Sequence, residues 1–265
     1  MKLYLHAISS YRSDKEDIVL KKELKSRYKV DIRRKDDFIF AGLLGALRLK
    51  EQTDISKESA LYLTSGYGNI NILAKMNKYI VEDKESIKLF DFINMLGNTT
   101  SFYVAQELGI KAKSIFQISD NFTYFNTLIS IYASLRQTNK EVVCGVIDLA
   151  SENDEVLQRV AAVEQNTPLV SSVVFSQLSL EEKGALCKLE FDTKFYTYEE
   201  IKEVISKSSQ KLYLSQRCKE LEGEKSSFYI ETDASYLINK AIQEQEDYLY
   251  VECYEQRYKL LKITA

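Results

Sequence analysis

The stretch KSIFQISDNFTYFNTLISIYASLRQTNKEVVCGVIDL, residues 113–149, decides the fold that we expect for this 265-residue chain. Residues 113–119 alternate apolar and polar side chains, which is typical of a β-strand. Bulky side chains then recur at the spacing of an amphipathic helix, namely Phe122, Phe125, Leu128, Ile129, Tyr132 and Leu135. Residues 141–149 have the composition of a buried strand, so the stretch reads as strand, turn, helix and strand.

Strands and helices continue on both sides of this stretch. Upstream we expect strands at 2–8 and 60–64 and helices at 36–49, 70–79 and 102–108, with small residues in 36–49 for close packing. Downstream we expect adjacent strands at 170–178 and 185–191, helices at 198–206 and 234–245, and strands at 211–214, 227–231, 248–254 and 258–263. No internal repeat, Pro/Gly/Ser-rich linker or low-complexity segment marks a domain boundary. This mixture predicts a layered α/β fold.

Composition argues against several classes of protein. The net charge of −3 gives no overall attraction for nucleic acid. No apolar run has the length of a membrane span, and the first residues lack the pattern of a signal peptide, so we expect a cytoplasmic protein without a membrane span. Four cysteines without a CxxC pair and a single histidine predict free thiols, with no metal or other cofactor: Cys144, Cys187, Cys218 and Cys253.

The turn Ser119-Asp120-Asn121 is the main candidate for chemistry. In α/β enzymes a strand-to-helix turn often carries a nucleophile beside the helix N-terminus. The helix dipole favours the charged form of Asp120, which is a poor acid and a weak nucleophile, whereas Asp120 or Asn121 can cap the helix. Ser119 as a nucleophile needs a base, and the single histidine, His6, lies in the N-terminal strand. Capping is therefore the favoured interpretation.

Two further features are candidate binding sites. Gly66-Tyr67-Gly68 lacks the third glycine of a dinucleotide fingerprint and the Gly-Lys-Ser/Thr of a P-loop, so we interpret it as a strand-to-helix turn. The basic stretch 21–35 includes Arg33 and Arg34 and is interleaved with acids and apolar residues. It is either a solvated face or a contact for an acidic partner.

Taken in order, the motifs of this chain resemble the β-ketoacyl synthases of the thiolase superfamily. The resemblance rests on five segments: RRKDDF at 33–38, LYLTSGYG at 61–68, NMLGNTTSFYVAQELG at 94–109, SIFQISDNFT at 114–123 and EVVCGVIDLA at 141–150. They are similar to the Arg-Arg-x-Asp-x-Phe entry, a strand ending in Gly-x-Gly, an Asn-x-x-x-Asn segment with its helix, the nucleophile elbow and the next strand. Residues 170–191 match the two strands that close the first half.

The resemblance implies a thiolase-like layered αβα fold with an abbreviated second half. Residues 1–195 correspond to a ketosynthase N-terminal-like domain and 196–265 to a shortened C-terminal remnant, together forming one compact unit. Asp120 stands where the family has its cysteine, and no histidine follows His6, whereas the family has two catalytic histidines in its second half. The chain is similar to chain-length factors, the non-catalytic subunits that also occur in aryl polyene and related polyene biosynthesis.

The resemblance therefore implies a subunit that heterodimerises with an active ketosynthase and helps set acyl or polyene chain length. In such dimers the strand before the nucleophile pairs across the two-fold axis, so we expect a partner interface, with an exposed apolar patch, at Lys113, Ser114, Ile115, Phe116, Gln117, Ile118, Phe122 and Phe125. An acyl carrier protein is a second expected partner, contacted by Arg33 and Arg34. Two alternatives stay open: a stand-alone enzyme acting on acyl thioesters through Asp120 or Ser119, and a non-catalytic homodimer that binds acyl chains or carrier proteins.

Overall fold

The computed structural model describes residues 1–119, 121–137, 140–150, 170–225 and 232–265. Its strands form a ten-stranded sheet in the order β3-β2-β4-β5-β1-β6-β10-β9-β7-β8. The first five are β1 (Lys2–Arg12), β2 (Ala60–Ser65), β3 (Ser114–Ile118), β4 (Glu141–Asp148) and β5 (Ser172–Ser179). The others are β6 (Cys187–Phe191), β7 (Lys211–Leu214), β8 (Glu224–Lys225), β9 (Tyr248–Tyr254) and β10 (Arg257–Thr264). The expected strand at 227–231 lies outside the described residues.

The two halves of the sheet repeat one topology. When the strands of each half are numbered along the chain, both halves have the order 3-2-4-5-1. In each half, strand two pairs in parallel with strands three and four. Strand five pairs antiparallel with strands four and one. The first strands, β1 and β6, join the halves as an antiparallel pair. The chain is thus a structural duplication, although no repeat is visible in its sequence.

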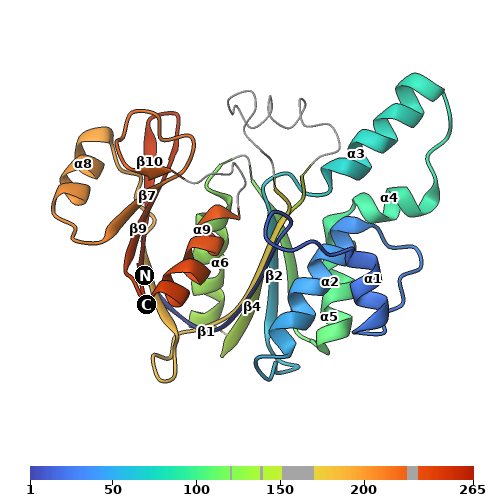
Figure 1. Ribbon diagram of the computed structural model, residues 1–265, viewed down its shortest axis with the longest axis horizontal. Helices are drawn as coiled ribbons and strands as arrows, with labels where there is room; N and C mark the ends of the chain where they lie inside the picture. The colour runs from blue at the N-terminus through green and yellow to red at the C-terminus, as the bar shows by residue number, and fades with distance from the viewer. Residues whose placement is uncertain (120, 138–139, 151–169, 226–231) are drawn as a thin grey trace.

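The helices form three layers around the sheet, which bends around the central layer (Figure 1). α6 (Thr123–Gln137) and α9 (Asp233–Glu244) lie between the two halves and share a core with the inward-facing side chains of both. On the outer face of the first half lie α1 (Leu20–Ser26), α2 (Asp37–Lys50) and α5 (Gly97–Leu108). α8 (Tyr198–Ser206) covers the outer face of the second half. This arrangement confirms the predicted thiolase-like layered fold.

The second half is abbreviated on its outer face. Between strands two and three the first half carries α5 and a projecting helical arm, whereas the second half has only the connection 215–223, with Cys218 and Leu221 packed into its outer core. The topological repeat starts its second half at β6, whereas the domain boundary at 195/196 stays a prediction. The expected pairing of the strands at 170–178 and 185–191 is wrong, because β1 lies between them as a partner of both.

α2 shows why the small residues at 41–46 are needed. Asp36 caps this helix by accepting a hydrogen bond of 3.1 Å from the N–H of Ile39. Gly45 lies against β5, where a Cβ atom would stand 2.5 Å from the Phe175 ring and 2.6 Å from Val173. The close approach of helix and sheet that the sequence predicts is therefore present, and a larger side chain would have to push the two layers apart.

Candidate functional site

Polar groups in the turn between β3 and α6 form hydrogen bonds with one another. Asp120 lies outside the described residues, but both of its neighbours are described. The Ser119 hydroxyl donates a hydrogen bond of 3.0 Å to the carbonyl oxygen of Asn121 and accepts one of 3.2 Å from Asn126 Nδ2. Its backbone carbonyl accepts a bond of 2.7 Å from Thr123 Oγ1. The side chain and the carbonyl group of Ser119 are therefore part of the hydrogen-bond network that holds the turn together.

The side chain of His6 does not join this network and contacts a neighbouring strand of the sheet. Its Nε2 lies 2.8 Å from the hydroxyl of Ser179 on β5, next to an irregularity in the β1–β5 register. This confirms the interpretation of His6 as a strand residue. A serine nucleophile at position 119 would need a base from another residue.

Phe122 carries the strained backbone of the turn. It directly precedes α6 and has a φ of +51°, a left-handed conformation that is rare for a bulky residue and marks strain at functional turns. Its ring is only 2% exposed and meets the ring of Phe195 edge-on, with centroids 5.3 Å apart. The side chain at this strained position is therefore an aromatic hydrocarbon, which supplies neither a nucleophile nor a base.

A buried carboxylate from the second half occupies the start of α6. The N–H of Phe122 donates a hydrogen bond of 3.0 Å to Glu252 Oε1 on β9, and Glu252 is only 4% exposed. Burial raises the pKa of Glu252 to about 7, against the opposing effects of Arg217 and of this hydrogen bond. Helix N-termini attract anions, and here the group at the N-terminus of α6 is the side-chain carboxyl of Glu252 from the same chain.

Asp148 makes the reciprocal contact. It ends β4, the counterpart of β9, and accepts a hydrogen bond of 3.0 Å from the N–H of Thr232, which directly precedes α9. Each half therefore sends a carboxylate from its fourth strand to the start of the other half's central helix. Sequence reasoning missed this pair, although one signal was available: Glu252 follows Tyr248 and Tyr250 on the inward face of a strand, where a charge is unexpected.

β3 is one of the two edge strands of the sheet in the described residues, and it is largely exposed. Ile115 and Ile118 are 37% and 50% exposed, and Lys113 and Ser114 are also exposed. The other two expected interface residues on this segment, Phe116 and Gln117, are half-buried. An unpaired strand edge offers backbone hydrogen bonds to a second chain.

Phe122 and Phe125 do not belong to this surface, contrary to expectation. Phe125 is fully buried and its ring stacks with Tyr250, with centroids 6.3 Å apart. Both phenylalanines project from the start of α6 into the core that the two sheet halves share. Their apolar periodicity reflects that core, so a partner chain has no access to them.

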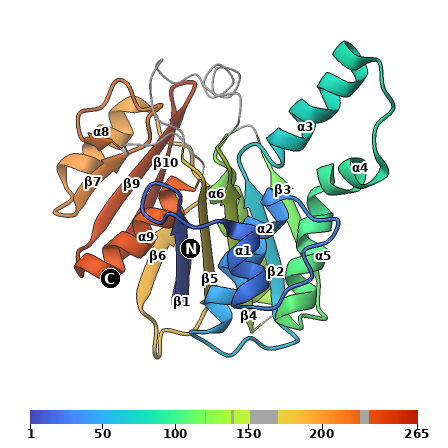
Figure 2. The same ribbon diagram turned by 45° about the vertical axis from the view of Figure 1, so that its right-hand side comes forward.

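A projecting arm extends the exposed apolar surface beyond β3. It consists of α3 (Ile70–Asn77), a π-helical turn (Lys78–Asp83) and α4 (Leu89–Met95), and it stands away from the body (Figures 1 and 2). α4 packs on α5, and α5 packs on β3. We call the exposed apolar side chains of these elements the arm surface: Leu73, Ile80, Val81, Leu89, Phe90, Phe92, Leu96, Phe102, Ile115 and Ile118.

A polar network ties both ends of the arm to α2. Asn69, at the start of α3, donates hydrogen bonds of 2.7 Å to Asp36 Oδ2 and 3.2 Å to the carbonyl oxygen of Asn94 on α4. Asn94 in turn donates one of 3.2 Å to the carbonyl oxygen of Arg34. Three of the segments that carry the sequence resemblance, at 33–38, 61–68 and 94–109, therefore meet at the base of the arm or next to it.

Arg33 and Arg34 are both exposed beside this network. Arg33 forms an ion pair of 2.8 Å with Asp31, which holds the pKa of that carboxyl well below its usual range. The guanidinium of Arg34 lies 4.6 Å from the ring centre of Phe90 on the arm. Both guanidinium groups are therefore exposed to solvent and lie next to the base of the arm.

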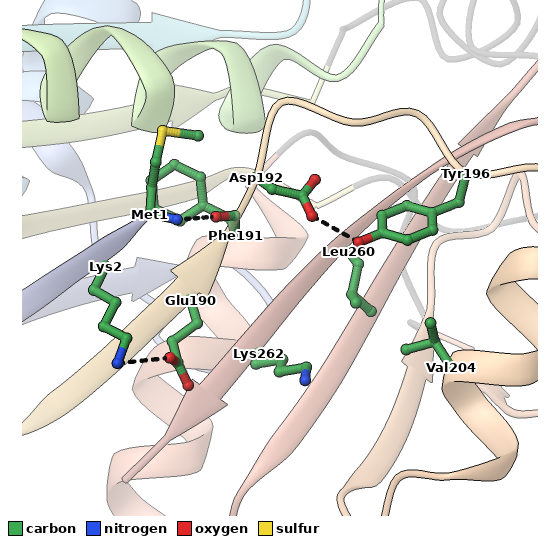
Figure 3. A pocket seen from close by; sticks show the side chains of 9 residues that line it. All are labelled: Met1, Lys2, Glu190, Phe191, Asp192, Tyr196, Val204, Leu260 and Lys262. Atoms are coloured by element: carbon green, nitrogen blue, oxygen red, sulfur yellow. Dashed lines mark hydrogen bonds and ion pairs between the residues drawn. The ribbon is translucent and has the colours of Figure 1, made fainter.

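One cavity, of about 320 Å³, lies in the outer layer of the second half, where α8 is the covering helix (Figure 3). Asp192 accepts a hydrogen bond of 2.6 Å from the Tyr196 hydroxyl, and Lys2 pairs with Glu190 at 3.4 Å. Its remaining lining residues are Met1, Phe191, Val204, Leu260 and Lys262. None of these residues belongs to the β3–α6 turn.

Other expectations concern thiols, metals and membranes. All four cysteines are buried free thiols, as the sequence predicts. The described part of the chain contains no cluster of three or more histidine, cysteine, aspartate or glutamate residues that could hold a metal ion. Within the same ranges, no helix has both the length and the hydrophobicity to cross a membrane.

Solved structures share this fold, whereas no protein-family model and no curated protein matches the chain. The chain is similar to one in the complex of the ketosynthase ApeO with its chain length factor ApeC from Xenorhabdus doucetiae, at 9% identity over 99% of both chains and a TM-score of 0.65. It is also similar to a chain of AntDE:AntF, a type II polyketide acyl-carrier protein in complex with its ketosynthase, at 12% identity over 100% of this chain and 99% of that chain and a TM-score of 0.66. A third similar structure is the ishigamide ketosynthase/chain length factor, at 9% identity over 94% of this chain and 86% of that chain and a TM-score of 0.65. The chain therefore has the thiolase-like fold of ketosynthase and chain-length-factor complexes.

Proposed function

We propose that this chain is a non-catalytic ketosynthase-like subunit that pairs with an active ketosynthase and helps set the length of the acyl or polyene chain. The observation that carries the proposal is the contact between Glu252 and the N–H of Phe122, the strained residue that directly precedes α6. A cytoplasmic location goes with this proposal.

Acyl transfer at this turn would need a nucleophile and backbone N–H groups for the developing oxyanion. The N–H of Phe122 is already bonded to Glu252, and a carboxylate at that place repels a second negative charge whenever it is ionised. The residue in the strained conformation is a buried phenylalanine. These features argue against the alternative of a stand-alone enzyme that uses Ser119.

The arm surface and the β3 edge support a partner subunit. Apolar side chains exposed along α3, α4, α5 and β3 gain about 25 cal/mol per Å² when a partner removes them from water. The edge of β3 adds the main-chain hydrogen bonds of strand pairing. Two of the similar solved structures are described as complexes of a ketosynthase with a chain length factor, so we propose a ketosynthase as the second chain.

An acyl carrier protein is the second proposed partner. One of the similar structures is described as an acyl-carrier protein in complex with its ketosynthase. Arg33 and Arg34 are exposed at the foot of the arm, where they can meet an acidic surface, and Arg34 also lies on Phe90. Charge reversal of both arginines should lower carrier-protein binding without affecting association with the ketosynthase.

The absence of acyl transfer can be tested on the purified chain. We expect no covalent acyl adduct by intact mass spectrometry after incubation with acyl-pantetheine thioesters and no turnover above background, while an active ketosynthase is acylated under the same conditions. Ser119→Ala and Asp120→Ala should leave the background rate unchanged. Turnover that either substitution abolishes would instead establish the stand-alone enzyme.

A further inference from the structure

The cavity beside α8 is lined by a lysine that forms no ion pair with the described residues. Lys262 on β10 lies directly opposite Glu190 on β6, and Lys2 on β1 lies opposite the same glutamate from the other side. Glu190 forms ion pairs with Lys2 at 3.4 Å and with Lys188 at 3.2 Å. One carboxylate therefore serves two lysines, and within the described ranges no carboxylate oxygen lies within 4.0 Å of the Lys262 nitrogen.

The second acidic residue of the cavity, Asp192, already has partners on both of its carboxylate oxygens. One oxygen accepts a hydrogen bond of 2.6 Å from the Tyr196 hydroxyl, and the other accepts one of 2.9 Å from the backbone N–H of Lys194. An anion that enters the cavity can therefore reach Lys262 without displacing a carboxylate of the protein from that lysine.

Apolar side chains lie next to Lys262 in the same cavity. Leu260 is two positions before Lys262 on β10, so both side chains project from the same face of the sheet. Val204 on α8 packs against the outer core that contains Leu260, and Met1 and Phe191 add further apolar lining (Figure 3). A cation beside hydrocarbon fits a ligand that joins an anionic group to an aliphatic chain.

We propose that this cavity binds an aliphatic monocarboxylate, with its carboxylate on Lys262 and its chain against Leu260, Val204 and Met1. The cavity volume of about 320 Å³ is near the lower end of the range for small-molecule sites, about 300–1,000 Å³, which favours a short or medium chain. The hydrogen bond from ammonium to carboxylate is charge-assisted. Burial of the chain should add roughly fourfold in affinity for each CH₂ group.

This inference is independent of the proposed function. The lining residues of the cavity belong neither to the β3–α6 turn nor to the arm surface. The measurements below use the isolated chain without a ketosynthase, so failure of the proposed heterodimer leaves the inference standing, and the reverse also holds.

Methyl NMR on the full chain tests the proposal with probes that the sequence already contains. Of the three methionines, Met1 lines the cavity, whereas Met76 and Met95 belong to the arm. Titration of ¹³C-methyl-methionine-labelled chain with octanoate should shift the Met1 signal saturably and leave the other two in place. Octanoate should bind roughly fifteenfold more tightly than hexanoate, because it buries two further CH₂ groups.

Two substitutions separate recognition of the charge from recognition of the chain. Lys262→Gln should weaken octanoate binding about fivefold, the upper end of what an exposed ion pair contributes, and leave binding of neutral octanamide unchanged. Lys202→Gln is the matched control, because it removes an exposed lysine of α8 that does not line the cavity. Val204→Phe fills the apolar part of the cavity and should weaken binding of both ligands.

Two results would overturn the inference. In the first, octanoate leaves the Met1 methyl signal in place or moves all three methionine signals alike, which would exclude specific binding at the cavity. In the second, octanoate and octanamide bind the natural chain equally well, which would show that Lys262 does not recognise the anion.

Discussion

The backbone N–H of Phe122 lies 3.0 Å from Glu252 Oε1, which joins the strained residue ahead of α6 to the second half of the chain. Asp148 and Thr232 form the equivalent contact from the first half to the second, also at 3.0 Å. The topological repeat explains the pair, since β4 and β9 are the fourth strands of their halves. The two contacts fasten the halves together across the central helices.

Glu252 should make stability depend on pH in a definite direction. Its folded pKa of about 7 lies above its ordinary value of 4.5, so the folded chain prefers the protonated group. Its contribution is fully present below about pH 4.5 and is lost as pH rises through 7, by about 3 kcal/mol.

Denaturant unfolding of the natural chain and of Glu252→Gln between pH 4.5 and 8 measures this effect. The difference between the two isolates Glu252 from the other ionisable or charged groups around it: Arg217, Asp233, Cys253 and Lys259. The variant should gain relative stability as pH rises. Parallel curves for the two proteins would contradict the assignment.

The left-handed backbone at Phe122 predicts an unusual order of stability for two substitutions. Both Phe122→Ala and Phe122→Gly lose the buried ring, at a cost of about 3–5 kcal/mol. Glycine tolerates a φ of +51° whereas alanine does not, so the glycine variant should be the more stable by about 1 kcal/mol. Urea unfolding of the pair tests this order, which the reverse ranking would refute.

Much of this architecture could be predicted because it is local. The helix that starts after Asp36, the strand at 60–65 and the end of α5 at Gly109, whose φ is +75°, all follow from nearby residues. The insertion of β1 between β5 and β6 could not be predicted, because strand pairing over such separations leaves no local pattern. The inward placement of Phe125 was missed for the same reason, since periodicity identifies an apolar face without saying what covers it.

The candidate site was predictable only in part. The sequence locates the turn at Ser119 and excludes a second histidine. It does not reveal Glu252, because this residue is a single charge on a strand and its burial and its contact with the residue ahead of α6 arise only in the folded chain. The strain at Phe122 is likewise a property of the folded backbone.

Asn69 should control the order of the arm. Asn69→Ala removes the hydrogen bonds to Asp36 and to the carbonyl of Asn94 and leaves the half-buried carboxylate of Asp36 with fewer partners. We expect faster amide hydrogen exchange in α3 and α4, by an amount equivalent to about 1–3 kcal/mol, with unchanged exchange in α9. Leu73→Ala is the matched control, because that exposed side chain lies on the same helix. Identical exchange in the two variants would argue against the network.

Ile118 should matter for association and not for folding. Its side chain is 50% exposed, so Ile118→Lys should change the free energy of unfolding by less than about 0.5 kcal/mol. Burying the ammonium against a partner should weaken binding by about 2 kcal/mol, or roughly thirtyfold. Leu186→Lys is the control, since Leu186 is 46% exposed and lies outside the arm surface. Equal binding by the two variants would remove β3 from the interface.

The mass of the assembly that this chain forms with a ketosynthase shows whether the chain is a partner subunit. The chain is co-expressed with an active ketosynthase from its own gene neighbourhood, purified through a tag on that partner, and measured by native mass spectrometry. We expect a one-to-one heterodimer that Ile118→Lys weakens and that Leu186→Lys leaves intact. A chain that stays monomeric, or that forms only homodimers, beside every such ketosynthase would contradict it.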